Sequence, residues 1–194
     1  MDLRGNPKAT KRGLRNNNPF NLQKTGDKWQ GKIPGNDSRF ETFDSVENGI
    51  RAGIIDIVGD IAKDGKNTFA KLFEEFAPNH ENDTTAYINF VSGVTGVKPN
   101  DQLNPGGKID RMFLYKLATA IIQQENGRND AKLIDAATIQ KGVDMAAAAP
   151  QIAKYIGATK PGPKGKGIIL KDYSGLFIAA LMIFLFLKFL TELK

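Results

Sequence analysis

The chain has no cysteine, one histidine and one tryptophan among its 194 residues. Without cysteine, disulfide bonds and thiolate metal sites are excluded. His80 has no companion at metal-ligand spacing, so we expect it at the surface. The sequence also lacks an internal repeat and any glycine motif typical of phosphate or dinucleotide binding. We therefore expect neither a metal nor another cofactor.

The N-terminal segment lacks the apolar core of a secretory signal, so we expect residues 1–11 to form a disordered basic arm. The net charge of +6 favours anionic partners, among which are nucleic acid, anionic lipid and the bacterial wall. The basic residues are spread along the chain without a groove-reading motif, so nucleic acid is not the expected partner.

The most distinctive stretch runs from Arg12 to Leu22 and contains three consecutive asparagines before Pro19. Asparagine and proline are poor helix and strand formers. Asparagine side chains also bond to nearby backbone and tolerate left-handed conformations. We therefore expect a rigid, irregular loop whose amides can bind a ligand rich in hydroxyl and amide groups. An ordinary surface turn is the alternative.

Helical apolar spacing recurs four times along the middle of the chain. The expected helices begin after a Ser45 cap and end near Gly65, cover 69–76, begin at 84 or 85, and cover about 109–125. A glycine- and proline-bearing segment at 26–38, typical of a hairpin loop, precedes a short strand expected at 39–43. These stripes predict a mainly helical core.

The composition changes after Gly127. Residues 129–157 are helical and alanine-rich, either a spacer or a support for the core, and residues 158–172 have the lysine, glycine and proline content of a linker. From 174 to 190 the only charge is Lys188, and a helix of that run would be roughly 25 Å long at about 1.5 Å per residue. We expect 173–194 to be a transmembrane anchor, with a buried partner-binding helix as the alternative.

Glu125 extends the apolar stripe of the last predicted helix, because it lies three residues after Ile122 and four after Ile121. Partial burial and the negative end of the helix dipole both favour a neutral carboxyl there. A carboxyl that is protonated near neutral pH can protonate the leaving oxygen of a glycosidic bond. Glu125 is thus a predicted catalytic acid, unless the helix end frays and exposes it.

Several of these stretches resemble, in order, a family of bacteriophage virion-associated, lysozyme-like domains that attack peptidoglycan. The matching residues are Arg12–Leu22, Trp29–Gly31, Phe40–Ser45, Gly49–Ala52, Phe76–Pro78, Glu81–Thr84 with Tyr87, and Glu125–Gly127. Phe20 departs from the pattern, since many relatives have glycine there. The glutamate comes last in the chain, which implies a circular permutation that makes Glu125 face the Asn-rich stretch across a groove.

The resemblance implies a glycosidase that is either a hydrolase or a lytic transglycosylase. A hydrolase needs a second carboxylate, for which Glu41 is the first choice and Glu81 and Asp37 are the others; a transglycosylase resembles a device with one acid. Predicted substrate contacts come from Arg15, Asn16, Asn17, Asn18, Asn21, Trp29 and Tyr87. Trp29 can instead be a packing residue, Arg15 can hold the loop, and Tyr87 can orient the glutamate.

The predicted fold class is mainly α (α+β, lysozyme-like), with a small β-hairpin lobe and a C-terminal transmembrane helix. The lysozyme-like domain is expected at 12–128. The expected function is to cleave peptidoglycan during phage entry, from a virion that contains lipid, although a role in lysis stays open. Expected partners are peptidoglycan, a lipid membrane and capsid or spike proteins. The alternative is an inactive structural virion protein that binds glycan or tethers the capsid or spike to the membrane.

Overall fold

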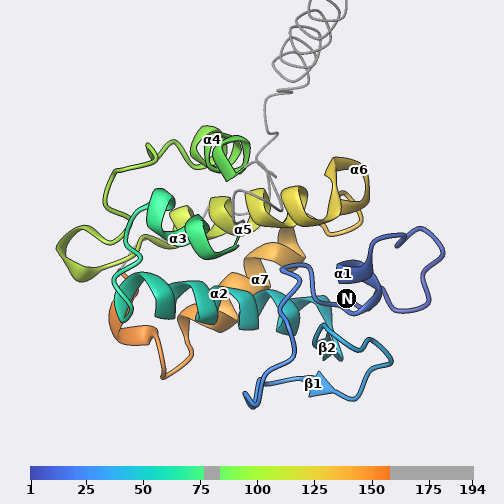
Figure 1. Ribbon diagram of the computed structural model, residues 1–194. Coiled ribbons are helices and arrows are strands. Elements are labelled where there is room, and N and C mark those ends of the chain that lie inside the picture. Colours follow the sequence, from blue (N-terminus) through green and yellow to red (C-terminus); the bar gives the residue numbers. More distant parts are fainter. Residues whose placement is uncertain (77–83, 158–194) are drawn as a thin grey trace, which may run out of the picture. The chain divides into compact units, whose positions relative to one another are not determined.

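The computed structural model describes residues 1–76 and 84–157. All of these residues belong to one compact unit, Met1–Lys164. Its elements, labelled in Figure 1, are α1 (Arg12–Arg15), β1 (Lys32–Ile33), β2 (Thr42–Phe43), α2 (Val46–Ala62), α3 (Phe69–Phe76), α4 (Thr84–Thr95), η1 (Pro105–Gly107), α5 (Arg111–Asn126), α6 (Arg128–Ala131), α7 (Ala136–Ala147) and η2 (Ala153–Tyr155).

Helix α5 is central in this unit, because it contacts α1, α2, α4, α6 and α7. Asp110 caps its first turn, because the Asp110 side chain accepts a hydrogen bond from the Phe113 amide at 2.8 Å. Leu114 and Leu117 are fully buried on the apolar stripe expected from the sequence. The central position of α5 fixes where its last turn, which carries Glu125, lies in the fold.

Helices α2 and α7 lie side by side and form the most extensive helix pair (Figure 1). Ser45 caps α2, as predicted, by accepting a hydrogen bond from the Asn48 amide at 3.4 Å. The close approach to α7 occurs at Gly142, where an added Cβ would lie 2.7 Å from the Ile50 side chain. The segment 129–157 is therefore part of the core rather than a spacer, which decides the alternative that the sequence left open.

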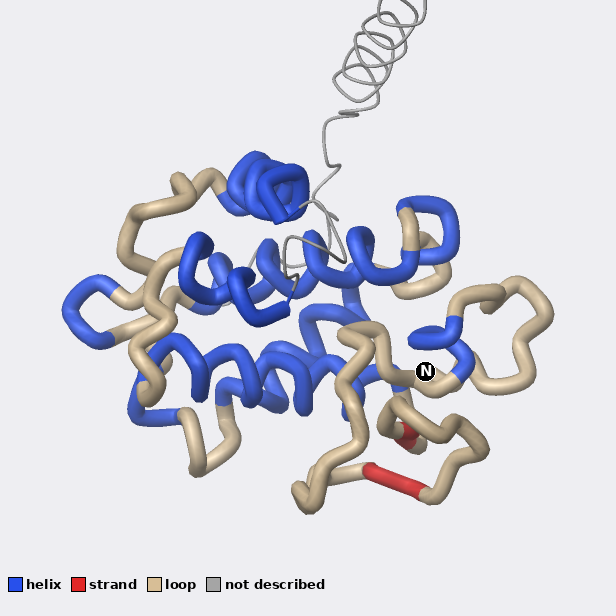
Figure 2. Tube along the Cα trace, viewed as in Figure 1, coloured by secondary structure: helices blue, strands red, loops and turns tan. Residues whose placement is uncertain are grey.

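The fold class predicted from the sequence requires a correction. The described residues form a mostly helical unit with one two-stranded sheet (Figure 2). Among these residues, no helix is both long and apolar enough to cross a membrane. A lysozyme-like fold with a transmembrane helix is thus not what the structure shows. The segments predicted to be the linker and the anchor, 158–172 and 173–194, lie outside the described residues.

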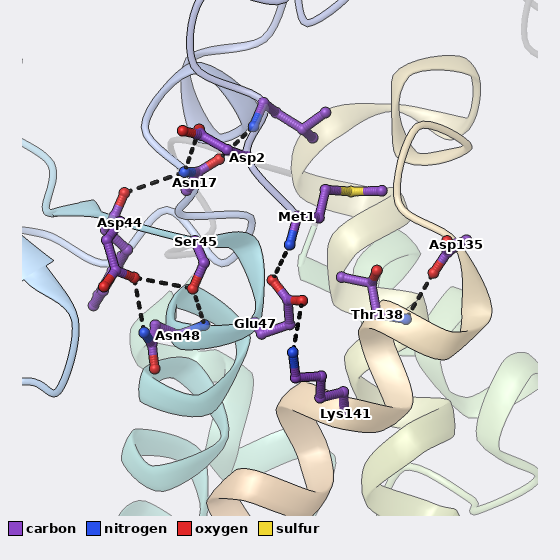
Figure 3. Close-up of polar contacts among 12 residues, drawn as sticks. Met1, Asp2, Asn17, Asp44, Ser45, Glu47, Asn48, Asp135, Thr138 and Lys141 are labelled. Atoms are coloured by element: carbon purple, nitrogen blue, oxygen red, sulfur yellow. Dashed lines mark hydrogen bonds and ion pairs between the residues drawn. The ribbon is translucent and has the colours of Figure 1, made fainter.

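The N-terminal segment is packed against the fold, so the prediction of a disordered arm at residues 1–11 was wrong. Leu3 and Ala9 are 3% and 2% exposed, and the Leu3 amide donates to Asn17 Oδ1 at 2.8 Å. The Met1 amino group lies 2.6 Å from Glu47 Oε2 on α2, and Figure 3 shows Glu47 between Met1 and Lys141 of α7. Two buried apolar side chains outweigh the polar composition that suggested disorder.

The Asn-rich loop, residues 16–22, lies on α2. An added Cβ at Gly49 would lie 2.0 Å from the Asn17 carbonyl oxygen, and one at Gly53 would lie 2.4 Å from the Phe20 ring. Two glycines one turn apart therefore let the loop backbone and Phe20 pack directly onto the helix. This packing and the adjacent antiparallel pair β1–β2, in which Lys32 pairs with Phe43, hold the loop next to the end of α5.

Candidate functional site

Glu125 lies in the last turn of α5 and is half-buried. Its carboxylate accepts two hydrogen bonds from distant parts of the chain: Asn21 Nδ2 donates to Oε2 at 2.9 Å, and the Tyr87 hydroxyl donates to Oε1 at 3.2 Å. The sequence predicted that Glu125 would face the Asn-rich loop across a groove. The structure brings the two together, but in direct contact through Asn21.

Asn21 reaches Glu125 because the loop turns back on itself. Both Asn17 and Asn21 have a positive φ, 50° and 52°, which asparagine adopts at less cost than most residues. The backbone N–H of Asn21 donates to the Asn18 carbonyl at 2.9 Å and closes the turn. The preference of asparagine for left-handed backbone thus directs one side-chain amide of the loop toward the carboxylate.

Tyr87 approaches Glu125 from α4 and is 6% exposed. Its ring packs against Phe73, with the ring centroids 4.7 Å apart. Burial, followed by the charge of Glu125 and the hydrogen bond to it, raises the pKa of Tyr87 well above its usual value. The hydroxyl therefore remains protonated at neutral pH and can donate to the carboxylate.

The three consecutive asparagines, in contrast, are 9%, 0% and 0% exposed and build the loop from inside. Asn16 Nδ2 donates to Asp37, Asn17 Nδ2 donates to Asp2 and the Phe43 carbonyl, and Asn18 Nδ2 donates to the carbonyls of Leu22 and Glu41. Their amide groups are consumed by the protein itself. The prediction that Asn16, Asn17 and Asn18 contact substrate does not fit this arrangement.

Glu41 was predicted to be a second catalytic carboxylate, and the structure places it where it cannot serve. It is 1% exposed, and its Oε1 accepts from Lys32 Nζ at 2.7 Å and from the Thr25 amide at 3.1 Å. A buried, ion-paired carboxylate holds the hairpin together and cannot reach a substrate.

Asp37, the other described alternative, accepts hydrogen bonds from the amides of Phe40 and Arg39 and from Asn16. These two amides, then the Asn16 side chain and Arg12, keep the pKa of Asp37 below its usual value. Its carboxylate therefore serves the turn in which it lies. Glu81 and His80 lie outside the described residues.

The remaining predicted contacts lie apart from the carboxylate. Trp29 is half-buried beside β1, and its carbonyl accepts from the Lys32 amide at 3.2 Å. Arg15 is exposed, and its guanidinium donates to the Thr10 carbonyl, as expected of a residue that holds the loop. Glu125, Asn21 and Tyr87 are thus the predicted residues that the structure brings together.

One residue of this site had no predicted role. Asn126 is fully buried, and its Nδ2 donates to the Pro19 carbonyl at 2.8 Å and to the Ile122 carbonyl at 3.0 Å. It joins the helix end to the Asn-rich loop one residue after Glu125. A polar residue four positions after Ile122 on the buried stripe was the available signal.

The described residues also include side chains of the metal-ligating types and line a cavity. In the part of the chain that the structure describes, no three His, Cys, Asp or Glu side chains could hold a metal ion together. A cavity of about 330 Å³ lies elsewhere, lined by Val97, Gln102, Leu103, Pro105, Lys108, Ile109, Asp110, Phe113 and Gly157. It includes none of the predicted site residues.

Comparison with known proteins relates the chain to a phage protein. No protein-family model matches it. Protein P5 of Pseudoalteromonas phage PM2 is 38% identical over 122 residues, which cover 61% of this chain and 72% of that protein. This identity, extended over most of the relative, shows that the chain belongs to the family of bacteriophage PM2 Protein P5.

Proposed function

We propose that this protein is a bacteriophage peptidoglycan glycosidase in which Glu125 is the catalytic acid. The observation that carries the proposal is the half-buried Glu125 carboxylate, held at one oxygen by Asn21 and at the other by Tyr87. The motif resemblance to wall-degrading domains points to the same residue. The phage relative supports a phage setting.

The two donors suit a carboxyl that must take up and release a proton. Both are uncharged, so they orient the group without the permanent charge that a lysine or arginine would supply. In the proposed reaction, protonated Glu125 gives its proton to the leaving oxygen of the glycosidic bond. The resulting carboxylate then accepts the proton of the attacking hydroxyl.

A mechanism with one acid agrees best with the described residues. Hydrolysis by two carboxylates requires a second group free to act on water or on the sugar. Glu41 is paired with Lys32, and Asp37 is held by its own turn. We therefore favour a lytic transglycosylase, in which a hydroxyl of the substrate attacks, over a muramidase that hydrolyses with water.

The setting of the reaction is also part of the proposal. We place the enzyme in the virion, in contact with other virion proteins, where it opens the wall as the phage enters. An inactive structural virion protein that binds glycan is the competing function. Activity against wall material separates the two, because the structural alternative needs none.

The test is a turbidity and zymogram assay of the full chain on purified peptidoglycan, with Glu125→Gln as the variant. General acid catalysis is worth about 10²–10⁴ in rate, so the substitution should lower clearing at least about a hundred-fold. Mass spectrometry of the released fragments should show anhydro ends from a transglycosylase and reducing ends from a hydrolase.

Glu74→Gln is the matched control, because it removes the same charge from an exposed position on α3. It should clear as fast as the unchanged protein. Absence of clearing by the unchanged, folded protein on walls of several bacterial types would contradict the enzyme and leave the structural role.

A further inference from the structure

The end of α5 is joined to the Asn-rich loop by a buried clasp. Asn126 is 0% exposed and uses both protons of its amide, one on the Pro19 carbonyl of the loop and one on the Ile122 carbonyl of its own helix. Pro19 lies two residues before Asn21, which holds Glu125. The clasp therefore connects the same two segments as the Asn21–Glu125 hydrogen bond, at a point where water is excluded.

Gly13 lies next to the side-chain oxygens of Asn21 and Asn126. A Cβ at this position would lie 2.6 Å from Asn21 Oδ1, 2.7 Å from Asn126 Oδ1 and 2.8 Å from the Asn18 carbonyl oxygen. Both side-chain oxygens are buried without a conventional hydrogen-bond donor. They lie where a Cβ would project from Gly13, so a Cα hydrogen of this glycine can form weak C–H···O bonds with them. A glycine is therefore needed where the oxygens of both asparagines converge.

The convergence explains the orientation of the Asn21 amide. With Oδ1 directed at Gly13, Nδ2 is the end of the amide that faces Glu125. An amide turned the other way would place an oxygen against the carboxylate and lose the hydrogen bond. The position of Gly13 thus helps to decide that Glu125 receives a donor.

We infer that Asn126 and Gly13 are positioning residues, which hold the Asn21 amide so that it donates to the Glu125 carboxylate. The inference rests on the proposed function for its consequence in catalysis, while its structural content is independent of that function. If these residues had only a structural role, their substitution would lower stability and leave the Asn21 side chain as it is.

The first experiment compares Asn126→Ala with Asp110→Ala, which removes the N-cap at the opposite end of the same helix. Both variants should lose stability. Per folded molecule, Asn126→Ala should lower kcat at least ten-fold with little change in KM, and it should move the pH profile of kcat. Asp110→Ala should keep the kcat and the pH profile of the unchanged protein. Equal effects of the two variants on kcat would overturn the inference.

The second experiment does not depend on lytic activity, and its substitutions do not create a large cavity. In the full chain labelled with ¹⁵N-asparagine, Glu125→Gln should shift the Asn21 side-chain amide signal, because the amide then donates to a neutral acceptor. In Gly13→Ala the added Glu125→Gln substitution should leave that signal in place, while in Gly59→Ala, whose Cβ meets nothing within 4 Å, it should shift the signal as in the unchanged protein. A shift of equal size in Gly13→Ala would overturn the inference. Absent lytic activity with the expected signals would contradict the proposed function alone.

Discussion

The asparagines of the loop make two different kinds of contact. Asn16, Asn17 and Asn18 point inward and satisfy backbone and carboxylate groups that the irregular loop would otherwise leave unpaired. Asn21 alone directs its amide to Glu125. Residue type therefore explains how the polar groups of the loop are satisfied, whereas the left-handed turn at Asn21 explains which amide reaches Glu125.

Tyr87→Phe tests the second donor to Glu125. A hydrogen bond to a charged group is worth about 1.5–3 kcal/mol, so wall-clearing activity should fall roughly ten-fold or more. Because the folded pKa of Tyr87 is raised, its contribution to stability is present below the unfolded value of about 10 and is lost as the pH rises above it. Absorbance titration of phenolate should lose its most alkaline component in the variant. An unchanged titration would contradict the buried pairing.

At the scale of residues, the sequence predicted the partly buried position of Glu125 but not the groups that surround it. Helical periodicity fixes the direction of a side chain, so the position of Glu125 after Ile121 and Ile122 placed it at the buried stripe. An irregular loop has no period, so nothing in the run of asparagines revealed which of them turn inward. The pairing of Glu41 with Lys32 depends on strand register, which two-residue strands do not specify.

At the scale of elements, α2 serves as the platform for the Asn-rich loop. Gly49 contacts the loop backbone and Gly53 contacts the Phe20 ring, so one face of the helix has no side chains to keep the loop away. Phe20 is 7% exposed as a result. Phe20, which the sequence motif did not predict, thus anchors the loop to the helix.

Gly49→Ala should therefore destabilise the protein although alanine is the better helix former. Overpacking costs about 1–3 kcal/mol, which exceeds the gain of about 1 kcal/mol from helix propensity. Gly59→Ala in the same helix meets no atom within 4 Å and should instead stabilise by up to about 1 kcal/mol. Denaturant unfolding of both variants measures the difference. Stabilisation by both would show that the loop does not rest on α2.

The elements themselves were predictable in proportion to their periodicity. The helices with long apolar stripes and cap residues, α2 and α5, were expected within a few residues of their bounds. The strand expected at 39–43 is reduced to Thr42–Phe43, because only these residues pair with β1. Helix α7 lies in a segment that was predicted to be helical. The sequence did not show that its small side chains allow a close approach to α2.

At the scale of the whole described unit, charges tie the N-terminus to the core. Burial alone would raise the pKa of Glu47, but the hydrogen bond from the Met1 amino group, together with its charge and Lys141, brings the pKa below its usual value. The polar composition of residues 1–11 predicted a disordered arm. Composition does not reveal a single long-range ion pair such as that between Met1 and Glu47. The arm, α2 and α7 therefore meet at one carboxylate.

Acid should weaken this arrangement. Because the folded pKa values of Glu47 and Asp37 are lowered, their contributions to stability are present above the unfolded values of about 4.3 and 3.9 and are lost as the pH falls through the folded ones. The melting temperature should be constant from neutral pH to about pH 5 and fall below about pH 4. Glu47→Gln should lower it at pH 7 and reduce the decline in acid. A variant with the same acid profile as the unchanged protein would show that Glu47 does not contribute.

The hydrogen bond between Asn21 and Glu125 spans 104 residues of sequence. During translation, the ribosome releases the loop long before it has made the helix that carries the carboxylate. An unfinished chain consequently has the loop without its acid, and the two meet only after most of the helical unit has emerged. On the proposed function, the capacity to cut wall would arise late in synthesis, and incomplete fragments would be inert inside the cell that makes them.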